Sequence, residues 1–254
     1  MRPPGSYQVL SRRRLVVSLA TVFIASFPAG PWQTNCYVVA TEPGAECLIL
    51  DPGLDAADGV RELVTEHRLK PVAVVLTHGH LDHMFSVAPL CGGYDATCWI
   101  HPDDRHLLAD PLRAMGPETA QLLARLTGGT TTFAEPDEVR ELADGVALEI
   151  AGLSLDALHA PGHTQGSVMY RADYPAAAPG GAEIDQVVFS GDVLLAGSIG
   201  RTDLPGGDHA AMLRSLRTKV LPLSDTTAVL PGHGGQTTMA RERATNPYLQ
   251  PDQL

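Results

Sequence analysis

The sequence contains few cysteines and no excess of basic residues, and both shortages exclude classes of protein. None of the four cysteines forms a Cys-x-x-Cys pair, so we interpret them as small buried hydrophobic residues, and not as metal ligands or disulfide partners. The formal net charge is −11, with 29 acidic residues against 18 basic ones. Because nucleic-acid-binding surfaces are basic, this balance argues against a nucleic-acid partner.

The chain also lacks internal repeats, a linker, and any apolar run of the ~20 residues that span a membrane. With 254 residues, of which 44% are hydrophobic, it can bury one substantial core. Short runs of apolar residues predict strands at residues 22–27, 36–40 and 47–50. Helical spacing of apolar residues predicts helices at residues 60–67 and 208–220, the second one capped by Asp208.

The heptapeptide Thr-His-Gly-His-Leu-Asp-His, at residues 77–83, carries most of the functional information. It follows the apolar run of residues 72–76, so its polar side chains emerge where a buried strand ends and a loop begins. His78 and His80 point the same way from an extended backbone, and the pair Asp82 and His83 can face a second position nearby. Imidazole nitrogen and carboxylate oxygen suit zinc, iron and manganese, so the heptapeptide predicts a metal site.

Three further ligand-type residues each follow an apolar stretch that ends in a turn containing glycine. They are His163 in Ala-Pro-Gly-His-Thr, Asp192 in Phe-Ser-Gly-Asp, and His233 in Leu-Pro-Gly-His-Gly. A lone histidine after a turn is as often structural as it is functional. The same context occurs three times, and this repetition favours a role as metal ligands.

With these motifs the sequence resembles the metallo-β-lactamase superfamily, and within it the glyoxalase II-like hydrolases, which act on hydroxyacylglutathione. The resemblance covers residues 23–254 and implies an α/β fold, a four-layer αββα sandwich whose strand-end loops hold two divalent metal ions. It implies that the first metal is held by His78, His80 and His163, that the second is held by Asp82, His83 and His233, and that Asp192 bridges them.

Asp51 follows the strand at residues 47–50 in a Leu-Asp-Pro-Gly turn. The resemblance implies that its carboxylate orients a ligand histidine, and an ordinary turn residue is the alternative. We expect zinc at the centre, with iron or manganese as alternatives.

Two divalent metals lower the pKa of a shared water toward ~7, so hydroxide is available without a protein nucleophile. Asp82 would act as the catalytic carboxylate, orienting this hydroxide or accepting a proton. A thiolate, whose parent thiol has a pKa of about 8.5, leaves without a strong general acid. We therefore expect a metal-dependent thioester hydrolase that acts on a small-molecule acyl-thiol substrate.

Other activities stay open. A mononuclear iron persulfide dioxygenase would use only His78, His163 and Asp192, and residues 197–208 are similar to segments of both these dioxygenases and the glyoxalase II-like proteins. Other hydrolytic substrates include lactones and phosphodiesters. Arg201 could contact an anionic substrate or form a salt bridge with Asp203 or Asp208. Glutathione-specific glyoxalase II has a basic C-terminal extension that this sequence lacks, so the thiol carrier is undetermined.

The N-terminus allows two interpretations. Residues 12–29, three arginines followed by an apolar run, resemble a secretory signal. Residues 22–27, however, supply the first strand that the family resemblance requires, and cleavage after Ala29 would remove it. We therefore expect residues 1–21 to be an extension outside the fold and residues 22–254 to form a single domain. The protein would be cytoplasmic without a membrane partner, an exported enzyme is the alternative, and the oligomeric state is undetermined.

Overall fold

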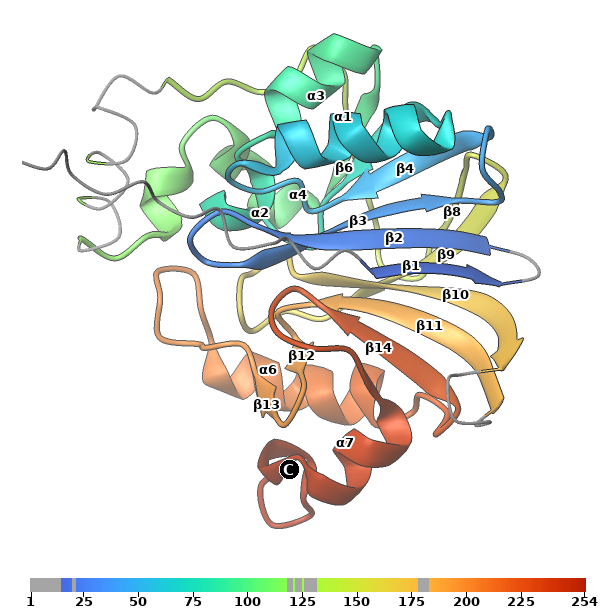
Figure 1. Cartoon of the computed structure of the whole chain (residues 1–254). Coiled ribbons are helices and arrows are strands. Elements are labelled where there is room, and N and C mark those ends of the chain that lie inside the picture. Colours follow the sequence, from blue (N-terminus) through green and yellow to red (C-terminus); the bar gives the residue numbers. More distant parts are fainter. Residues whose placement is uncertain (1–14, 20–21, 118–120, 122–124, 126–131, 178–182) are drawn as a thin grey trace, which may run out of the picture.

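A computed structural model describes residues 15–19, 22–117, 121, 125, 132–177 and 183–254. Two β-sheets lie face to face and helices cover the outer face of each, which gives a four-layer αββα sandwich (Figure 1). The expected α/β class and layer order are therefore confirmed. No helix in the described ranges is long and apolar enough to cross a membrane.

The first sheet has seven strands in chain order, antiparallel from β1 to β4 and parallel from β4 to β7. Its strands are β1 (Leu15–Leu19), β2 (Val22–Ala29), β3 (Thr34–Ala40), β4 (Glu46–Leu50), β5 (Lys70–Val75), β6 (Thr97–Ile100) and β7 (Val139–Glu141). The helical segments associated with it are α1 (Ala56–His67), α2 (Leu81–Met84), α3 (Val87–Tyr94), α4 (Pro102–Arg105), η1 (His106–Leu108) and η2 (Pro111–Ala114).

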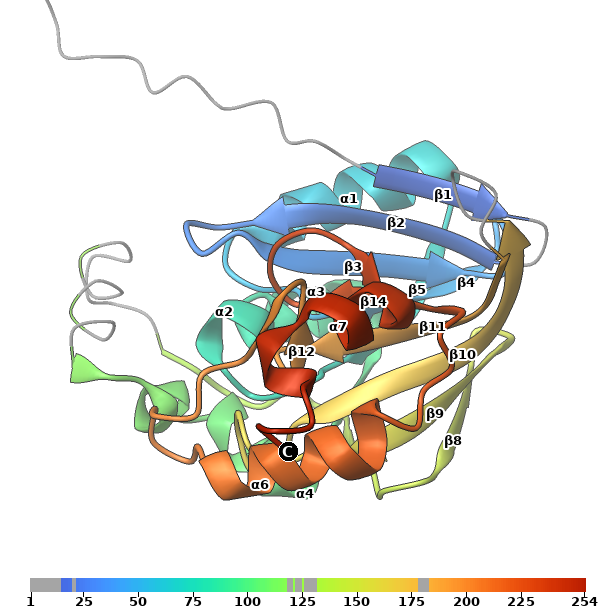
Figure 2. The same ribbon diagram turned by 90° about the horizontal axis from the view of Figure 1, so that it is seen from below.

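The second sheet has six strands in the order β15-β14-β11-β10-β9-β8, and α6 and α7 cover its outer face (Figure 2). Its strands are β8 (Ala147–Ile150), β9 (Leu153–His159), β10 (Val168–Ala177), β11 (Glu183–Gly191), β14 (Thr227–Pro231) and β15 (Thr237–Thr238). The remaining elements are the hairpin β12 (Leu194–Leu195) and β13 (Ser198–Ile199), and the helices α6 (His209–Ser215), η3 (Leu216–Val220), α7 (Met239–Thr245) and η4 (Pro247–Leu249). As predicted, Asp208 caps α6, because its Oδ1 accepts a hydrogen bond from the backbone N–H of Ala211 at 2.9 Å.

Strand β2 is apolar at every position except Ser26, and both of its faces are buried. Phe23 and Phe27 point toward α1, whereas the alternating residue Ile24 points into the layer between the sheets. Gly59 of α1 packs so closely on this strand that a Cβ atom there would lie 2.5 Å from the ring of Phe27. The four cysteines are also buried and unpaired, as expected.

Residues 15–19, which the sequence analysis placed in an extension outside the fold, form the edge strand β1 (Figure 2). The strand pairs with β2 in antiparallel register, from Leu15 opposite Ser26 to Leu19 opposite Val22. Its β-branched pair, Val16 and Val17, suits a strand, and the pairing satisfies the backbone groups of the outer edge of β2. Residues 1–14 lie outside the described ranges.

The predicted functional residues lie at one end of the sandwich because the strands before them run in the same direction. Strand β4 is parallel to β5, and β11 is parallel to β14. Asp51 follows β4, Asp192 follows β11 and His233 comes shortly after β14, while the heptapeptide at residues 77–83 follows β5. An isolated bridge between Thr34 and His233 joins the two halves at this end.

Candidate metal centre

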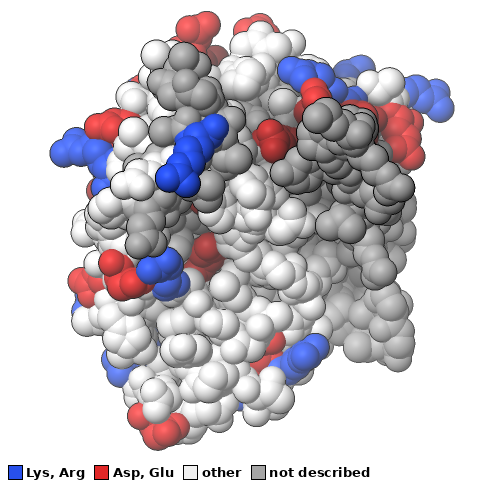
Figure 3. Space-filling view, turned by 60° about the vertical axis from the view of Figure 1, so that its left-hand side comes forward, with Lys and Arg blue, Asp and Glu red and all other residues white. Residues whose placement is uncertain are grey.

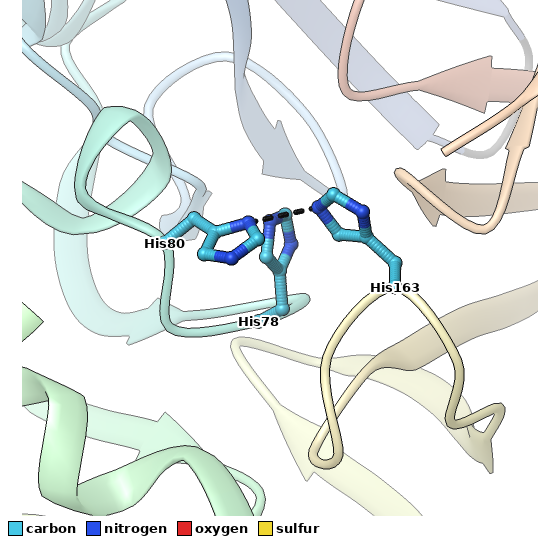
Figure 4. A group of neighbouring side chains, drawn as sticks. All are labelled: His78, His80 and His163. Carbon is cyan, nitrogen blue, oxygen red and sulfur yellow. Dashed lines mark hydrogen bonds between the residues drawn. The ribbon is translucent and has the colours of Figure 1, made fainter. Parts of the chain in front are cut away.

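The first group of ligand-type residues consists of His78, His80 and His163, which come from two loops far apart in the sequence (Figure 4). Nδ1 of His80 lies 2.8 Å from Nε2 of His163, and the centroid of the His78 ring is 4.9 and 4.7 Å from those of His80 and His163. All three side chains are at most 5% exposed. The structure thus brings together the three residues that the resemblance assigned to the first metal.

Burial favours the neutral forms of His78 and His80. It lowers the pKa of His78 well below the usual value, with a further contribution from the neighbouring His83. It also lowers the pKa of His80 to about 3, and the charge of His163 adds to this effect. A neutral imidazole has a nitrogen lone pair, which is the form that binds a metal.

The second group consists of Asp82, His83 and His233. Nε2 of His233 lies 3.1 Å from Oδ2 of Asp82 and 3.3 Å from Nε2 of His83. Burial would raise the pKa of Asp82, but the charges of His83 and His233 outweigh burial and hold this pKa below its usual range. Burial would conversely lower the pKa of His83, but the carboxylates of Asp82 and Asp192 outweigh it and raise this pKa to about 10.

Asp192 lies between the two groups. Its Oδ2 atom is 3.6 Å from Nε2 of His163 in the first group and 3.5 Å from Nε2 of His233 in the second. Its Oδ1 atom is 3.6 Å from Nε2 of His83. A carboxylate in this position can serve both groups, as the bridging role of Asp192 requires.

The donor set fits divalent metal ions. Ligands of a tetrahedral ion with bonds of about 2.1 Å lie about 3.4 Å from one another. The separation of His80 from His163 and the separations within the second group, 2.8 to 3.6 Å, are of that order, and His78 offers a nitrogen within 4.8 Å of the other two ligands of its group. Nε2 of His78 and Oδ1 of Asp192 are buried and make no hydrogen bond to any described residue. Buried polar atoms without a partner are costly, and a bound cation would satisfy them.

Asp51 sets the hydrogen-bonding state of two histidines. Its Oδ2 lies 3.0 Å from Nδ1 of His83 and accepts the Thr77 hydroxyl at 2.6 Å. The Thr77 Oγ1 in turn lies 3.0 Å from Nδ1 of His78. Because the hydroxyl proton goes to Asp51, Thr77 accepts the proton of His78, and in their neutral forms both histidines present Nε2 to a metal. This contact is the one expected of a carboxylate that orients a ligand histidine, and the Thr77 link extends it to His78.

Two backbone carbonyls do the same for His163 and His233. Nδ1 of His163 donates to the carbonyl of Arg201 at 2.8 Å, and Nδ1 of His233 donates to the carbonyl of Trp32 at 3.1 Å. The sequence could not reveal these acceptors, because every residue has a carbonyl. Thr34 was missed for a similar reason: its hydroxyl donates to Oδ2 of Asp82 at 2.9 Å from a strand distant in sequence.

A cleft of about 380 Å³ opens onto both groups. Its walls include five of the ligand-type residues and a largely apolar set consisting of Trp32, Leu81, Ala114, Met115, Leu195 and Leu204. Arg201 also lines the cleft, and its guanidinium forms the salt bridge with Asp203 that the sequence analysis allowed, at 2.7 Å. On the face in Figure 3, basic and acidic side chains of the described residues are interspersed.

The sequence model of the metallo-β-lactamase superfamily matches residues 29–233. The chain belongs to this superfamily. An uncharacterized protein of Mycobacterium tuberculosis is 42% identical over 230 residues, which cover 90% of this chain and 98% of the relative. Hydroxyacylglutathione hydrolase GloC of Haemophilus influenzae is 33% identical over 232 residues, which cover 89% of this chain and 97% of GloC.

Two crystal structures of superfamily members are similar to this fold. The BLEG-1 B3 metallo-β-lactamase is 38% identical with a TM-score of 0.73, covering 89% of this chain and 99% of that chain. TTHA1623 in a di-iron-bound form is also 38% identical, with a TM-score of 0.65, covering 92% of this chain and 100% of that chain. Membership of the superfamily, together with two clusters of histidine and aspartate, supports metal-dependent hydrolysis and leaves the identity of the metal open.

Proposed function

We propose that this protein is a glyoxalase II-like hydrolase that cleaves the thioester bond of a small acyl-thiol substrate with two divalent metal ions, zinc in the first instance. The observation that carries the proposal is a complete set of seven ligand-type side chains in two groups, with Asp192 between them. The 33% sequence identity with GloC, which extends over 89% of this chain, supports the choice of substrate class.

The bound metals would supply hydroxide at neutral pH and polarise the substrate carbonyl. The protein side chains do the positioning. Because its pKa is held low, Asp82 stays ionised and acts as a hydrogen-bond acceptor that orients the attacking water, and it is only a weak base. Thr34 fixes the Asp82 carboxylate by donating to Oδ2. Asp192, His163 and His233 line the same cleft, so the substrate carbonyl would lie between the two ligand groups.

The leaving group and the cleft walls also agree with a thioester. A thiolate is a stable leaving group and needs no strong acid, whereas an amine needs a proton from one. The apolar side chains of Trp32, Leu81 and Met115 can exclude water from the acyl group while the charged residues stay on the cleft floor.

The experiment is metal analysis of protein purified without added metal, combined with three activity assays. We expect two metals per chain, hydrolysis of S-lactoyl thiol esters, and no oxygen uptake with a persulfide. A β-lactam is the third substrate, because BLEG-1 is a β-lactamase, and turnover of it should be slower than that of the thioester.

The variants His83→Ala and His233→Ala test whether the second group is used. Each should reduce thioester hydrolysis by at least about 100-fold, because both metals would contribute to supplying hydroxide at neutral pH. Full activity in both variants, together with one iron per chain and persulfide-dependent oxygen uptake, would instead establish the mononuclear dioxygenase. A matched control is Arg243→Lys, a change at a salt bridge with Asp225 outside the ligand groups, which should leave the rate unchanged.

A further inference from the structure

Asp104 is a buried carboxylate to which the proposed reaction assigns no role. It lies in α4, is only 1% exposed, and accepts three hydrogen bonds. Its Oδ2 accepts the backbone N–H of Gly79 at 2.8 Å and the hydroxyl of Thr164 at 2.7 Å. Its Oδ1 accepts the backbone N–H of Gly166 at 2.8 Å. Burying a carboxylate costs free energy unless its oxygens are hydrogen-bonded, and both oxygens of Asp104 are.

The donors of these hydrogen bonds adjoin the first ligand group in the sequence. Gly79 stands between His78 and His80, and Thr164 directly follows His163. One oxygen atom of Asp104 therefore holds both loops that carry this group. The length and direction of two hydrogen bonds to the same atom fix the separation of the loops, and with it the separation of the histidine nitrogens.

The backbone packs tightly around this carboxylate. A Cβ atom on Gly166 would lie 2.6 Å from Cγ of Asp104, and one on Gly79 would lie 3.0 Å from the Asp104 carbonyl oxygen. Both positions need glycine to let the loops approach α4 this closely. A longer or differently placed acceptor could not take the same three hydrogen bonds without moving a loop.

A second contact joins the start of α4 to the loop of His163. The ring of His101, the residue before α4, stacks on His159 with centroids 3.8 Å apart and an interplanar angle of 11°. Nε2 of His159 lies 2.8 Å from the carbonyl of Gln165. The helix that carries Asp104 is therefore held against this loop through both His101 and Asp104, so Asp104 has little freedom to move away from it.

We propose that Asp104 is a positioning residue for the first ligand group, setting the spacing of the His78 and His80 loop relative to His163 and thereby the affinity of this group for metal. The proposal rests on the metal centre of the proposed function. Asp104 differs from Asp51, which contacts the ring of His83 directly, because Asp104 acts through the backbone and the Thr164 hydroxyl beside the ligands.

The test is the substitution Asp104→Asn in the full chain, measured by titration with Zn²⁺ against a chelating dye and by the visible absorption of bound Co²⁺. The amide keeps the shape of the carboxylate but places an N–H₂ against a backbone N–H, either of Gly79 or of Gly166. We expect affinity at the first group to fall about 10- to 100-fold with a changed Co²⁺ spectrum, while the second group keeps its affinity. Saturating Zn²⁺ should restore two metals per chain, because the loss is one of affinity and not of folding.

The matched control is Glu242→Gln. Glu242 is 0% exposed and also accepts three hydrogen bonds, from Thr237, Gly197 and Asn246, none of which is next to a ligand-type residue in the sequence. Glu242→Gln should lower the melting temperature of the metal-free protein and leave the metal affinities of both ligand groups unchanged. Thr164→Val is a milder second variant that removes only the hydroxyl contact with Asp104. It should lower the metal affinity of the first group about 5-fold. It serves if Asp104→Asn does not fold.

The outcomes separate the two proposals. If Asp104→Asn and Thr164→Val bind both metals with the affinity of the unaltered protein, Asp104 has no positioning role and the hydrolase proposal stands. An equal loss at both groups, with a fall in melting temperature like that of Glu242→Gln, would make Asp104 purely structural. If the unaltered protein binds no metal, the proposed function fails and this inference fails with it.

Discussion

Replacing Asp51 by asparagine should weaken the second ligand group through the hydrogen bonds of His83. Asp51 has a φ of +49°, in the left-handed region, which asparagine tolerates better than other non-glycine residues. The substitution therefore removes the charge of the side chain and replaces one acceptor oxygen with a donor N–H₂, with little backbone strain. The side chain is 2% exposed, so water cannot replace a lost hydrogen bond.

The amide in Asp51→Asn has two orientations, and both are unfavourable. If its oxygen faces His83 and the Thr77 hydroxyl, its nitrogen meets the backbone N–H of Thr77, which now donates to Oδ1 at 2.8 Å, and the cost is about 1–3 kcal/mol. If its nitrogen faces His83, then Nδ1 becomes an acceptor and Nε2 carries the proton, which removes the metal-binding lone pair. Loss of such a partner weakens metal binding about 10- to 100-fold, or about 1.4–2.7 kcal/mol.

The assay is Zn²⁺ titration of Asp51→Asn. A second readout is ¹⁵N NMR of the histidine side chains in the metal-free protein at a pH above the His83 pKa of about 10, where a single proton remains on the ring and its position can be assigned. We expect the Zn²⁺ site of the second group to lose affinity by the stated factor and thioester hydrolysis to recover in excess Zn²⁺. Asp104→Asn is the reciprocal control, because it should act on the first group. Unchanged affinity at both groups together with an unchanged proton on Nδ1 of His83 would refute the role given to Asp51.

Three further predictions concern the bridge, the proton balance and the N-terminus. Asp192→Ala should lower the total metal content and abolish hydrolysis together, since its carboxylate lies against both groups, and normal metal stoichiometry would contradict the bridge. Because the pKa of His83 is raised to about 10 in the metal-free protein, its proton must leave when metal binds. Binding at the second group should therefore release protons at pH 7 and weaken about 10-fold per unit as pH falls below that pKa, which calorimetry in buffers of different ionisation enthalpy would detect or disprove. A chain that begins at Val22 should fold and stay active after losing only the edge strand β1, whereas deletion through Ala29 removes Phe23 and Phe27 from the core. At about 3–5 kcal/mol for each phenylalanine, the second deletion consumes most of a typical stability of 5–15 kcal/mol, and a soluble, active protein starting at Gly30 would favour the exported, processed form.

The sequence by itself predicted the ligand-type residues and the strands that present them. Residues 77–83 concentrate four of them in one short segment after an apolar run, and this local pattern can be recognised without any knowledge of the fold. The predicted strands at residues 22–27, 36–40 and 47–50 correspond to β2, β3 and β4, because strands buried on both faces are rich in apolar residues. The resemblance carried by these motifs then supplied the αββα layers that the structure confirms.

Only the tertiary structure decided which groups surround each ligand. The carbonyls of Trp32 and Arg201 fix two histidines, yet a carbonyl is present in every residue and gives no sequence signal. Asp104 lies in an ordinary polar stretch, and its connection to Gly79 and Thr164 exists because the sandwich packs α4 against two loops that are distant in sequence. Strand β1 likewise depends on pairing with the free edge of β2. The identity of the metal ligands follows from side-chain chemistry that a short stretch of sequence reveals. The distances between the ligands, and which nitrogen of each histidine carries a proton, depend on contacts that form only when the chain has folded.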